Sequence, residues 1–152
     1  MRRLTLALVL VLIGCNGTET PTSIHLPRQF AMYDFAPGLI ATTADSTMAL
    51  SGMTVDMGTD RSFRMITVYN VLYMGAAAGR TPRSVTDTLT WRFDVTGTQL
   101  RIIHTGDALN PTDEVLPYND ADPQFSFQFK RNFRPWSNAT AVQANISVRE
   151  TS

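Results

Sequence analysis

The clearest pattern in this chain is the stretch VTDTLTWRFDV, residues 85–95, in which apolar and polar side chains alternate. Leu89, Trp91 and Phe93 occupy every second position, with threonine or arginine between them. Successive side chains of a β-strand point to opposite faces of the sheet, so this alternation predicts a strand with one buried face and one wet face. The expected buried face consists of Val85, Leu89, Trp91, Phe93 and Val95, with Asp87 in phase.

The same two-residue period continues on both sides of that strand. Residues 96–98, Thr-Gly-Thr, are typical of a tight turn, so residues 99–104 are predicted to return as the second strand of a hairpin. Residues 58–61, Gly-Thr-Asp-Arg, predict a second hairpin between strands over 48–57 and 62–74. The strand over 62–74 is apolar on both faces, which predicts a central position or a cover by another element.

The remaining segments are shorter and less regular. Alternating apolar residues predict further strands, and Gly- and Pro-containing stretches predict loops. The expected strands cover 30–35, 125–130 and 140–149, the expected loops cover 75–84 and 106–123, and a short helix within 37–48 or 110–116 is an alternative.

Together these elements predict an all-β fold. Many short strands separated by turns are typical of an antiparallel meander that closes into a small barrel, with a β-sandwich as the alternative. Trp91, Phe93 and Leu100 are expected inside this domain because each lies on the apolar face of the hairpin.

The N-terminus has the pattern of an export signal. Met1-Arg2-Arg3 is followed by an apolar run over 4–13 and then by Gly14-Cys15. A transmembrane helix needs about 20 apolar residues, and this run is too short. The stretch after it also lacks the A-x-A-like site of ordinary secretory cleavage. We therefore interpret residues 1–14 as a signal peptide.

The residues at the end of this leader, Leu12-Ile13-Gly14-Cys15, resemble the lipobox of bacterial lipoproteins. The resemblance implies cleavage between Gly14 and Cys15 and a diacylglycerol on the thiol of Cys15, which is the only cysteine in the chain. Residues 15–27 are rich in Thr and Pro and predict a flexible tether, and 28–152 predict a single β domain. The expected location is the outside of a bacterial membrane, anchored by lipid.

Two stretches of the domain resemble a known family. These are Met53-Thr-Val-Asp-Met-Gly-Thr-Asp-Arg-Ser-Phe63 and Leu89-Thr-Trp-Arg-Phe-Asp-Val-Thr-Gly-Thr-Gln-Leu100-Arg-Ile. With the lipobox, their rhythm is similar to that of small lipocalin-like lipoproteins of bacterial envelopes. The resemblance covers about residues 46–104 and implies a lipocalin-like barrel with a binding role.

Composition and the absence of known motifs reduce the classes of function that the sequence supports. Without the leader, 11 basic and 13 acidic residues remain, a net charge of −2 that argues against nucleic-acid binding. The chain has no nucleophile elbow, zinc-protease motif, phosphate loop or cysteine pair, and its only histidines are His25 and His104. We expect no enzyme activity and no cofactor.

Two weaker metal hypotheses have simpler alternatives. The acidic residues of the loop over 106–123 could hold calcium, but a solvated loop is favoured because the EF-hand glycine and closing glutamate are missing. Methionines could bind copper. However, Met53, Met57 and Met65 are in phase with core positions, so packing is the favoured role. The acidic residues concerned are Asp107, Asp113, Glu114, Asp120 and Asp122.

The segment over 130–136, Lys-Arg-Asn-Phe-Arg-Pro-Trp, interleaves cations and aromatic rings. One hypothesis makes Arg131, Phe133, Arg134 and Trp136 a contact surface for a ligand or partner. The favoured alternative is a loop that closes the barrel with its rings.

The function predicted from these observations is a lipid-anchored binding or interaction module of the cell envelope. Its ligand would be a small apolar molecule or another envelope component. The alternative is a purely structural domain with a filled core, and a metal-binding protein or an enzyme is less favoured because no motif supports either.

Overall fold

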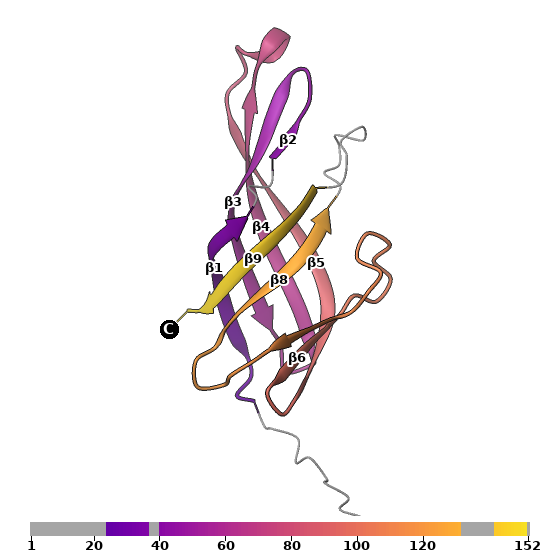
Figure 1. Ribbon diagram of the computed structural model, residues 1–152. Coiled ribbons are helices and arrows are strands. Elements are labelled where there is room, and N and C mark those ends of the chain that lie inside the picture. The colour runs from indigo at the N-terminus through magenta and orange to yellow at the C-terminus, as the bar shows by residue number, and fades with distance from the viewer. Residues whose placement is uncertain (1–23, 37–39, 132–141, 152) are drawn as a thin grey trace, which may run out of the picture.

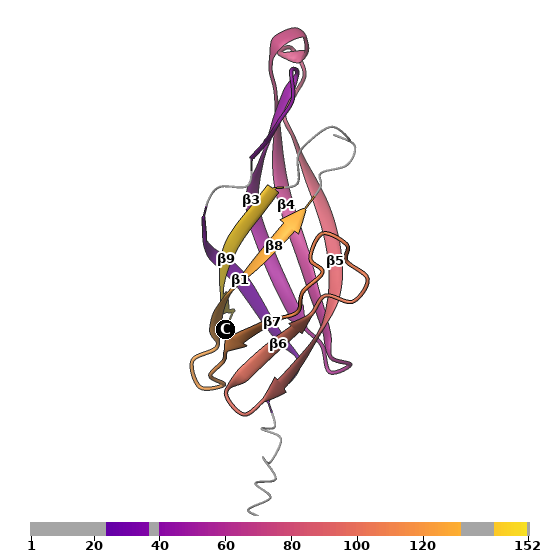
Figure 2. The same cartoon turned by 45° about the vertical axis from the view of Figure 1, so that its right-hand side comes forward.

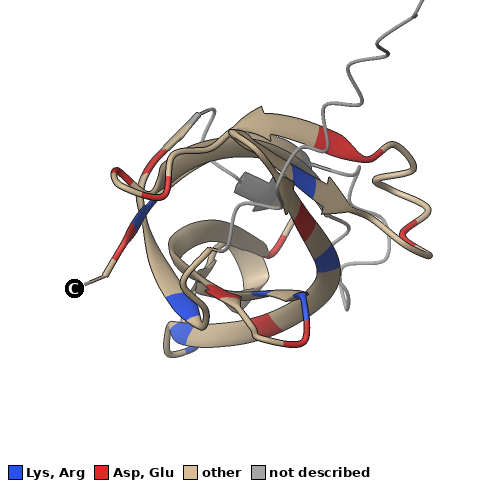
Figure 3. Ribbon diagram, turned by 90° about the horizontal axis from the view of Figure 1, so that it is seen from below, with Lys and Arg blue, Asp and Glu red and all other residues tan. Residues whose placement is uncertain are grey.

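The computed structural model describes residues 24–36, 40–131 and 142–151, and over these residues the chain forms one antiparallel sheet. The sheet order is β7-β6-β5-β4-β3-β1-β9-β8, with β2 paired to β3 beside this path. Seen from below, the strands run round a ring in which acidic and basic residues are interspersed (Figure 3). The strands are β1 Arg28–Ala36, β2 Ile40–Thr42, β3 Ser46–Met57, β4 Ser62–Tyr73, β5 Arg83–Thr96, β6 Gln99–Ile103, β7 Glu114–Pro117, β8 Gln124–Arg131 and β9 Val142–Glu150.

This architecture confirms the predicted all-β barrel and not the alternative sandwich, because one continuous sheet curves until its end strands meet. The central position predicted for 62–74 is also confirmed, since β4 lies between β3 and β5. The turn between β5 and β6 contains Gly97 at a φ of 58°, a conformation that glycine adopts without steric cost. That turn pairs Thr96 with Gln99 and so sets the register of the hairpin.

The alternation of β5 places its apolar face in the core as predicted. Trp91 is 3% exposed, Phe93 is 2% exposed and Leu100 of β6 is fully buried. Across the sheet, Phe63 of β4 stacks on Trp91 with ring centroids 6.4 Å apart. Rings from the opposite side of the barrel complete this layer, because Phe127 of β8 meets Phe63 edge-on at 5.6 Å.

Side chains therefore fill the barrel interior at the level of these rings. Phe30 and Phe125 add an edge-on pair at 5.0 Å. The methionines that were predicted to pack do so, and Met53, Met57 and Met65 are buried in the same cluster. Unbranched thioether side chains fit the irregular gaps that remain between the rings.

One end of the sheet continues beyond the barrel body as an arm. β3, β4 and the beginning of β5 extend past the other strands, with β2 alongside and a short 3-10 turn, η1 Gly75–Ala77, at the tip (Figures 1 and 2). The beginning of β1 lies near the opposite end of the molecule (Figure 1). The tip of the arm and the N-terminal end of the described residues are thus far apart.

The structure corrects two predictions about the less regular segments. β7 lies within 106–123, which was predicted to be all loop, because Glu114–Pro117 pair with β6. The proposed helices are wrong, since the described parts of 37–48 and 110–116 contain strands β2, β3 and β7. β2 has three residues and β7 has four. Alternation over so short a stretch is too weak a signal for either of these two strands to be recognised.

Other predictions concern the ends of the described ranges. Ile24 and Leu26, in the predicted tether, pack against the core. Within the described residues no helix is long and apolar enough to cross a membrane. Gly14 and Cys15, together with Phe133, Arg134 and Trp136, lie outside the described residues, as does the side chain of Arg131.

The aromatic core generates a prediction about stability. We expect Trp91→Ala to lower the free energy of unfolding by about 3–5 kcal/mol, because the variant loses ring contacts and leaves a cavity. Chemical denaturation measures this change. Thr88→Ala, on the exposed face of the same strand, is the control and should leave the midpoint nearly unchanged. An unaltered midpoint for Trp91→Ala would show that this ring does not support the core.

Candidate functional site

The two end strands of the sheet, β7 and β8, meet along a seam. In the described part of the chain β7 pairs only with β6, and β8 pairs only with β9, although β7 and β8 lie against each other. A side chain joins them, because both carboxylate oxygens of Glu114 accept from the backbone N–H of Gln128, at 3.0 and 3.2 Å. The seam is thus closed by side chains where a barrel ordinarily uses a backbone ladder.

Farther along β8, the side chain of Asn110 makes the backbone hydrogen bonds that a neighbouring strand would otherwise make. Its Oδ1 accepts from the backbone N–H of Lys130 at 2.8 Å, and its Nδ2 donates to the carbonyl of the same residue at 3.1 Å. An asparagine amide can do this because it has an acceptor and donors, as a peptide unit has. Asn110 is 7% exposed, so these backbone groups of β8 are paired where water is largely excluded.

We call the two hydrogen bonds between Asn110 and the Lys130 backbone the clamp. Asp107 links the clamp to β5, because it bonds to both Asn110 and Trp91. One carboxylate oxygen accepts from Trp91 Nε1 at 3.1 Å and from Asn110 Nδ2 at 2.9 Å. The other accepts from the backbone N–H of Leu109 at 2.9 Å. Desolvation opposes ionisation of Asp107, but these hydrogen bonds together outweigh it and lower its pKa. A continuous hydrogen-bonded path therefore runs from Trp91 through Asp107 and Asn110 to Lys130.

His104 is packed into the same cluster. Its ring lies on Trp91 with centroids 4.0 Å apart. Its Nδ1 is 2.8 Å from the carbonyl oxygen of Thr112, and this nitrogen carries a hydrogen because a carbonyl can only accept. Nε2 is buried and has no hydrogen-bond partner within the described residues. His104 is therefore a packing residue of this cluster, 7% exposed and in contact with the Trp91 ring.

A hollow of about 410 Å³ lies over this seam, and we call it the seam hollow. Burial raises the pKa of Glu114, which is the largest effect, and the hydrogen bond from the Gln128 backbone opposes it. Gln143 Nε2 donates to Gln128 Oε1 at 3.0 Å and orients both amides. The side chains that define the hollow include His104, Asn110, Glu114, Gln128, Lys130 and Gln143.

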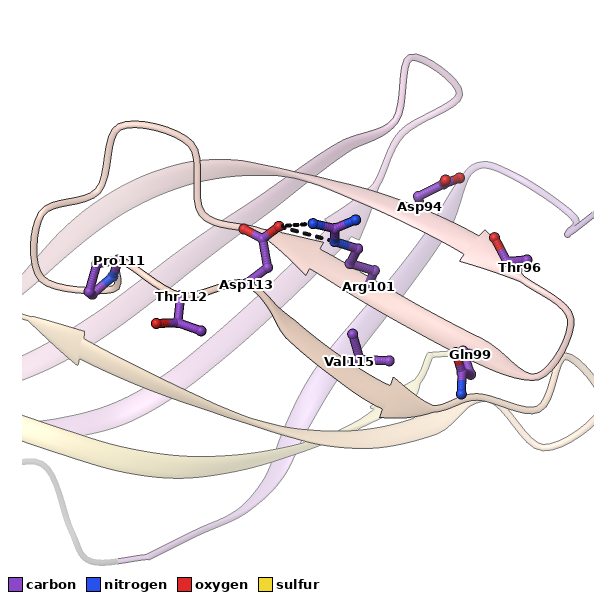
Figure 4. A pocket seen from close by; sticks show the side chains of 8 residues that line it. All are labelled: Asp94, Thr96, Gln99, Arg101, Pro111, Thr112, Asp113 and Val115. Carbon is purple, nitrogen blue, oxygen red and sulfur yellow. Dashed lines mark hydrogen bonds and ion pairs between the residues drawn. The ribbon is translucent and has the colours of Figure 1, made fainter.

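A larger groove of about 710 Å³ adjoins it on the outer face of β6 and β7 (Figure 4). Here Arg101 and Asp113 form an ion pair, with nitrogens 2.6 and 3.0 Å from one carboxylate oxygen. The Arg101 hydrogen bond is the main cause of the lowered pKa of Asp113. Because the guanidinium is already engaged, this groove offers a ligand less than the seam hollow does.

Many residues of the acidic loop are exposed, as a solvated loop requires, but several of its carboxylates are hydrogen-bonded or ion-paired within the protein. Asp120 pairs with Arg28 at 3.0 Å and with His25 at 3.1 Å, which ties this loop to the start of β1. Within the described ranges, no three His, Cys, Asp or Glu side chains are grouped so that they could hold a metal ion. The carboxylates that suggested calcium from sequence, Asp107 and Asp113 among them, instead hold the loop in place.

The sequence predicted a contact surface or a closing loop over 130–136. It did not predict that Asn110, in the loop after β6, contacts Lys130. Of the predicted contact segment over 130–136, Lys130 reaches the seam hollow. Asn110 and Asp107 were not recognised as a clamp because their partners lie 16 to 20 residues away in the chain. The Asn-Pro pair at 110–111 is a turn signal, and it was the only local indication.

We compared the chain with known protein families, with curated protein sequences and with solved structures, and none of the three gave a match. The class of protein is therefore defined by the fold itself: a small antiparallel β-barrel domain, closed at its seam by side chains.

The clamp generates a prediction. We expect Asn110→Ala to lower the free energy of unfolding by about 2–4 kcal/mol, because it leaves the backbone N–H and C=O of Lys130 unpaired and each such group costs about 1–3 kcal/mol. Amide hydrogen exchange at Lys130 should accelerate along with the loss of stability. Gln143→Ala removes an exposed amide from the same hollow and should change stability little. Equal stability of the two variants would contradict the clamp.

Glu114 generates a prediction about pH. Its pKa in the folded protein is raised above the ordinary value of 4.5, so the folded state binds more protons than the unfolded state between the two values. Its contribution to stability is therefore present at lower pH and is lost as pH rises through the folded pKa. We expect Glu114→Gln to remove this part of the pH dependence, measured by denaturation from pH 4 to 8. A variant whose stability falls over that range as much as the parent's would contradict this assignment.

Proposed function

We propose that this protein is a lipid-anchored binding module of the bacterial cell envelope, and that it holds a polar group of an envelope component in the seam hollow. The observation that carries the proposal is the convergence of Glu114, Lys130 and the buried His104 on one cavity of about 410 Å³. Ligand sites for small molecules have volumes of about 300–1,000 Å³ and combine a few placed polar groups with a shaped surface.

Two further observations support binding at the surface. The aromatic rings of Phe63, Trp91 and Phe127 pack across the barrel, so an apolar ligand would have to displace core side chains. His104 Nε2 has no hydrogen bond to a nucleophile in the described part of the chain, so the hollow supports binding better than catalysis. The leader with Cys15 and the resemblance to lipocalin-like lipoproteins support an anchored location.

The chemistry of the hollow indicates its ligand class. Glu114 supplies acceptors, the ammonium of Lys130 supplies donors, and the two amides of Gln128 and Gln143 supply both. The opposite charges of Glu114 and Lys130 cancel. A ligand with neutral hydroxyl and amide groups suits such a site, and the saccharide–peptide polymer of the cell wall carries both.

The packed core also supports a second candidate, a purely structural envelope domain. The two candidates differ in what the seam hollow does, because a structural domain needs the clamp but not the ligand-facing charges. Lys130 is exposed and its described contacts to Asn110 use only backbone atoms, so its side chain can be changed without breaking the clamp.

The test is a titration of the full chain with soluble disaccharide–peptide fragments of the cell wall, followed by nuclear magnetic resonance. We expect shifts at the backbone amides of Glu114, Gln128 and Lys130. Lys130→Ala should weaken binding about tenfold, since a hydrogen bond to a charged group contributes about 1.5–3 kcal/mol. Arg64→Gln, on the exposed face of β4, is the control. Absence of localised shifts would favour the structural candidate, and saturable uptake of an apolar fluorophore near Trp91 would favour an apolar ligand.

The anchor is tested separately. Cys15→Ala should abolish metabolic labelling with a lipid and leave uncleaved precursor or soluble protein. Mass spectrometry of the mature wild-type protein checks the site directly: an unmodified Cys15, or an N-terminus elsewhere, would contradict the anchored location. This result is independent of whether the seam hollow binds a ligand.

A further inference from the structure

The tip of the arm contains a second hollow of about 360 Å³, which is separate from the seam. It lies between the loop that leads into β3 and the loop that follows β4. We call it the tip hollow. Its lining includes Thr43, Asp45, Ser46, Tyr73, Arg80 and Arg83.

The two loops that form the tip hollow are fixed to each other. The backbone N–H of Met74 donates to the carbonyl of Asp45 at 2.9 Å. Gly75 has a φ of 55°, and a Cβ there would lie 3.0 Å from the carbonyl oxygen of Ala44, so the close approach of the loops requires glycine. Thr43 Oγ1 accepts from the backbone N–H of Ser46 at 3.1 Å and holds the first loop. The hollow is therefore built before any ligand arrives.

Two guanidinium groups belong to this hollow. Arg80 is held over the ring of Tyr73, with its Cζ 5.7 Å from the ring centroid. Arg83 begins β5 and is exposed. Within the part of the chain that the structure describes, neither arginine has a carboxylate within ion-pair distance, whereas Arg28, Arg61, Arg64 and Arg101 each do.

A carboxylate also lines the tip hollow without neutralising the arginines. Asp45 is exposed, and none of its oxygens is within 4.0 Å of a basic nitrogen in the described residues. Two cations and one anion thus share a small space. Guanidinium groups pair with carboxylate or phosphate oxygens, and a nearby carboxylate attracts a cationic donor in the same ligand.

We propose that the tip hollow binds a zwitterionic group, in which a carboxylate or phosphate is carried next to a primary ammonium. Arg80 and Arg83 hold the anionic oxygens, and Asp45 accepts from the ammonium. This chemistry is shared by a free amino acid and by the phosphoethanolamine headgroup of a lipid. The tip is remote from the end where the described chain begins, so an anchored molecule would present this site away from its own membrane.

The experiment titrates the full chain with phosphoethanolamine, phosphocholine and alanine, and follows backbone amide shifts. We expect phosphoethanolamine or alanine to shift Ser46, Ala77 and Arg80. Phosphocholine is the matched ligand control because its quaternary ammonium cannot donate a hydrogen bond to Asp45. The expected preference for phosphoethanolamine over phosphocholine should disappear in Asp45→Asn.

Paired variants distinguish a site from general charge. The double variant Arg80→Gln, Arg83→Gln should weaken binding at least tenfold. The control double variant Arg64→Gln, Arg92→Gln removes the same charge from exposed positions on the barrel body and should bind as the parent does. Unchanged unfolding midpoints in all variants exclude loss of the fold as the cause.

A vesicle-binding experiment distinguishes a lipid headgroup from a free amino acid as the ligand. With Cys15→Ala as the common background, cosedimentation with phosphatidylethanolamine vesicles but not phosphatidylcholine vesicles would identify a lipid headgroup. Binding of alanine without vesicle binding would identify a free or wall-borne amino acid. If neither ligand binds, or if both double variants bind equally, the proposal is wrong. Glu114→Gln should not affect this site, so failure here is distinguishable from failure of the seam hollow.

Discussion

The structure depends on one hydrogen-bonded path, which runs from Trp91 to Asp107, to Asn110 and to the backbone of Lys130. Among the residues that the structure describes, β7 and β8 do not pair by backbone hydrogen bonds, so the edge of β8 would otherwise carry unpaired backbone groups. Asn110, from the loop after β6, pairs the backbone N–H and C=O of Lys130, and Glu114 of β7 pairs the backbone N–H of Gln128. Because the same loop also packs His104 on Trp91, closing the barrel and completing its core are one structural event.

This way of closing the barrel explains why the candidate site lies at the seam. A backbone ladder would leave no space between the end strands, whereas a closure made of side chains leaves a hollow lined by their polar atoms. Glu114 shows the cost and the use of such a position: it bonds to the Gln128 backbone, yet burial raises its pKa.

The arm is built differently from the seam, because paired strands rather than loop side chains hold it together. β3 and β4 are each 12 residues long, enough to form both the barrel wall and the projecting hairpin. Loops carried on a rigid scaffold are favourable places for recognition. The protein therefore has a partly buried cluster at the barrel seam and, at the tip of the arm, a group of two arginines and one aspartate.

The sequence by itself determined the long strands and the core, because both depend on local periodicity. The alternation around Trp91 identified β5 and its buried face, and the turn at Gly97 identified the hairpin with β6. Short segments such as β7 escaped recognition, since three or four residues carry too little periodicity. The lipobox-like pattern at Cys15 is also local, and lipid attachment there stays a prediction.

Tertiary structure alone decided where the polar residues of the loops act. Asn110 and Lys130 are 20 residues apart, and their contact exists only because the sheet curves until its ends meet. Arg80 and Asp45 share a hollow because β3 and β4 run side by side to the tip. A polar residue in a loop has no period to reveal its partner, so its role is set by which strands the closed fold brings together.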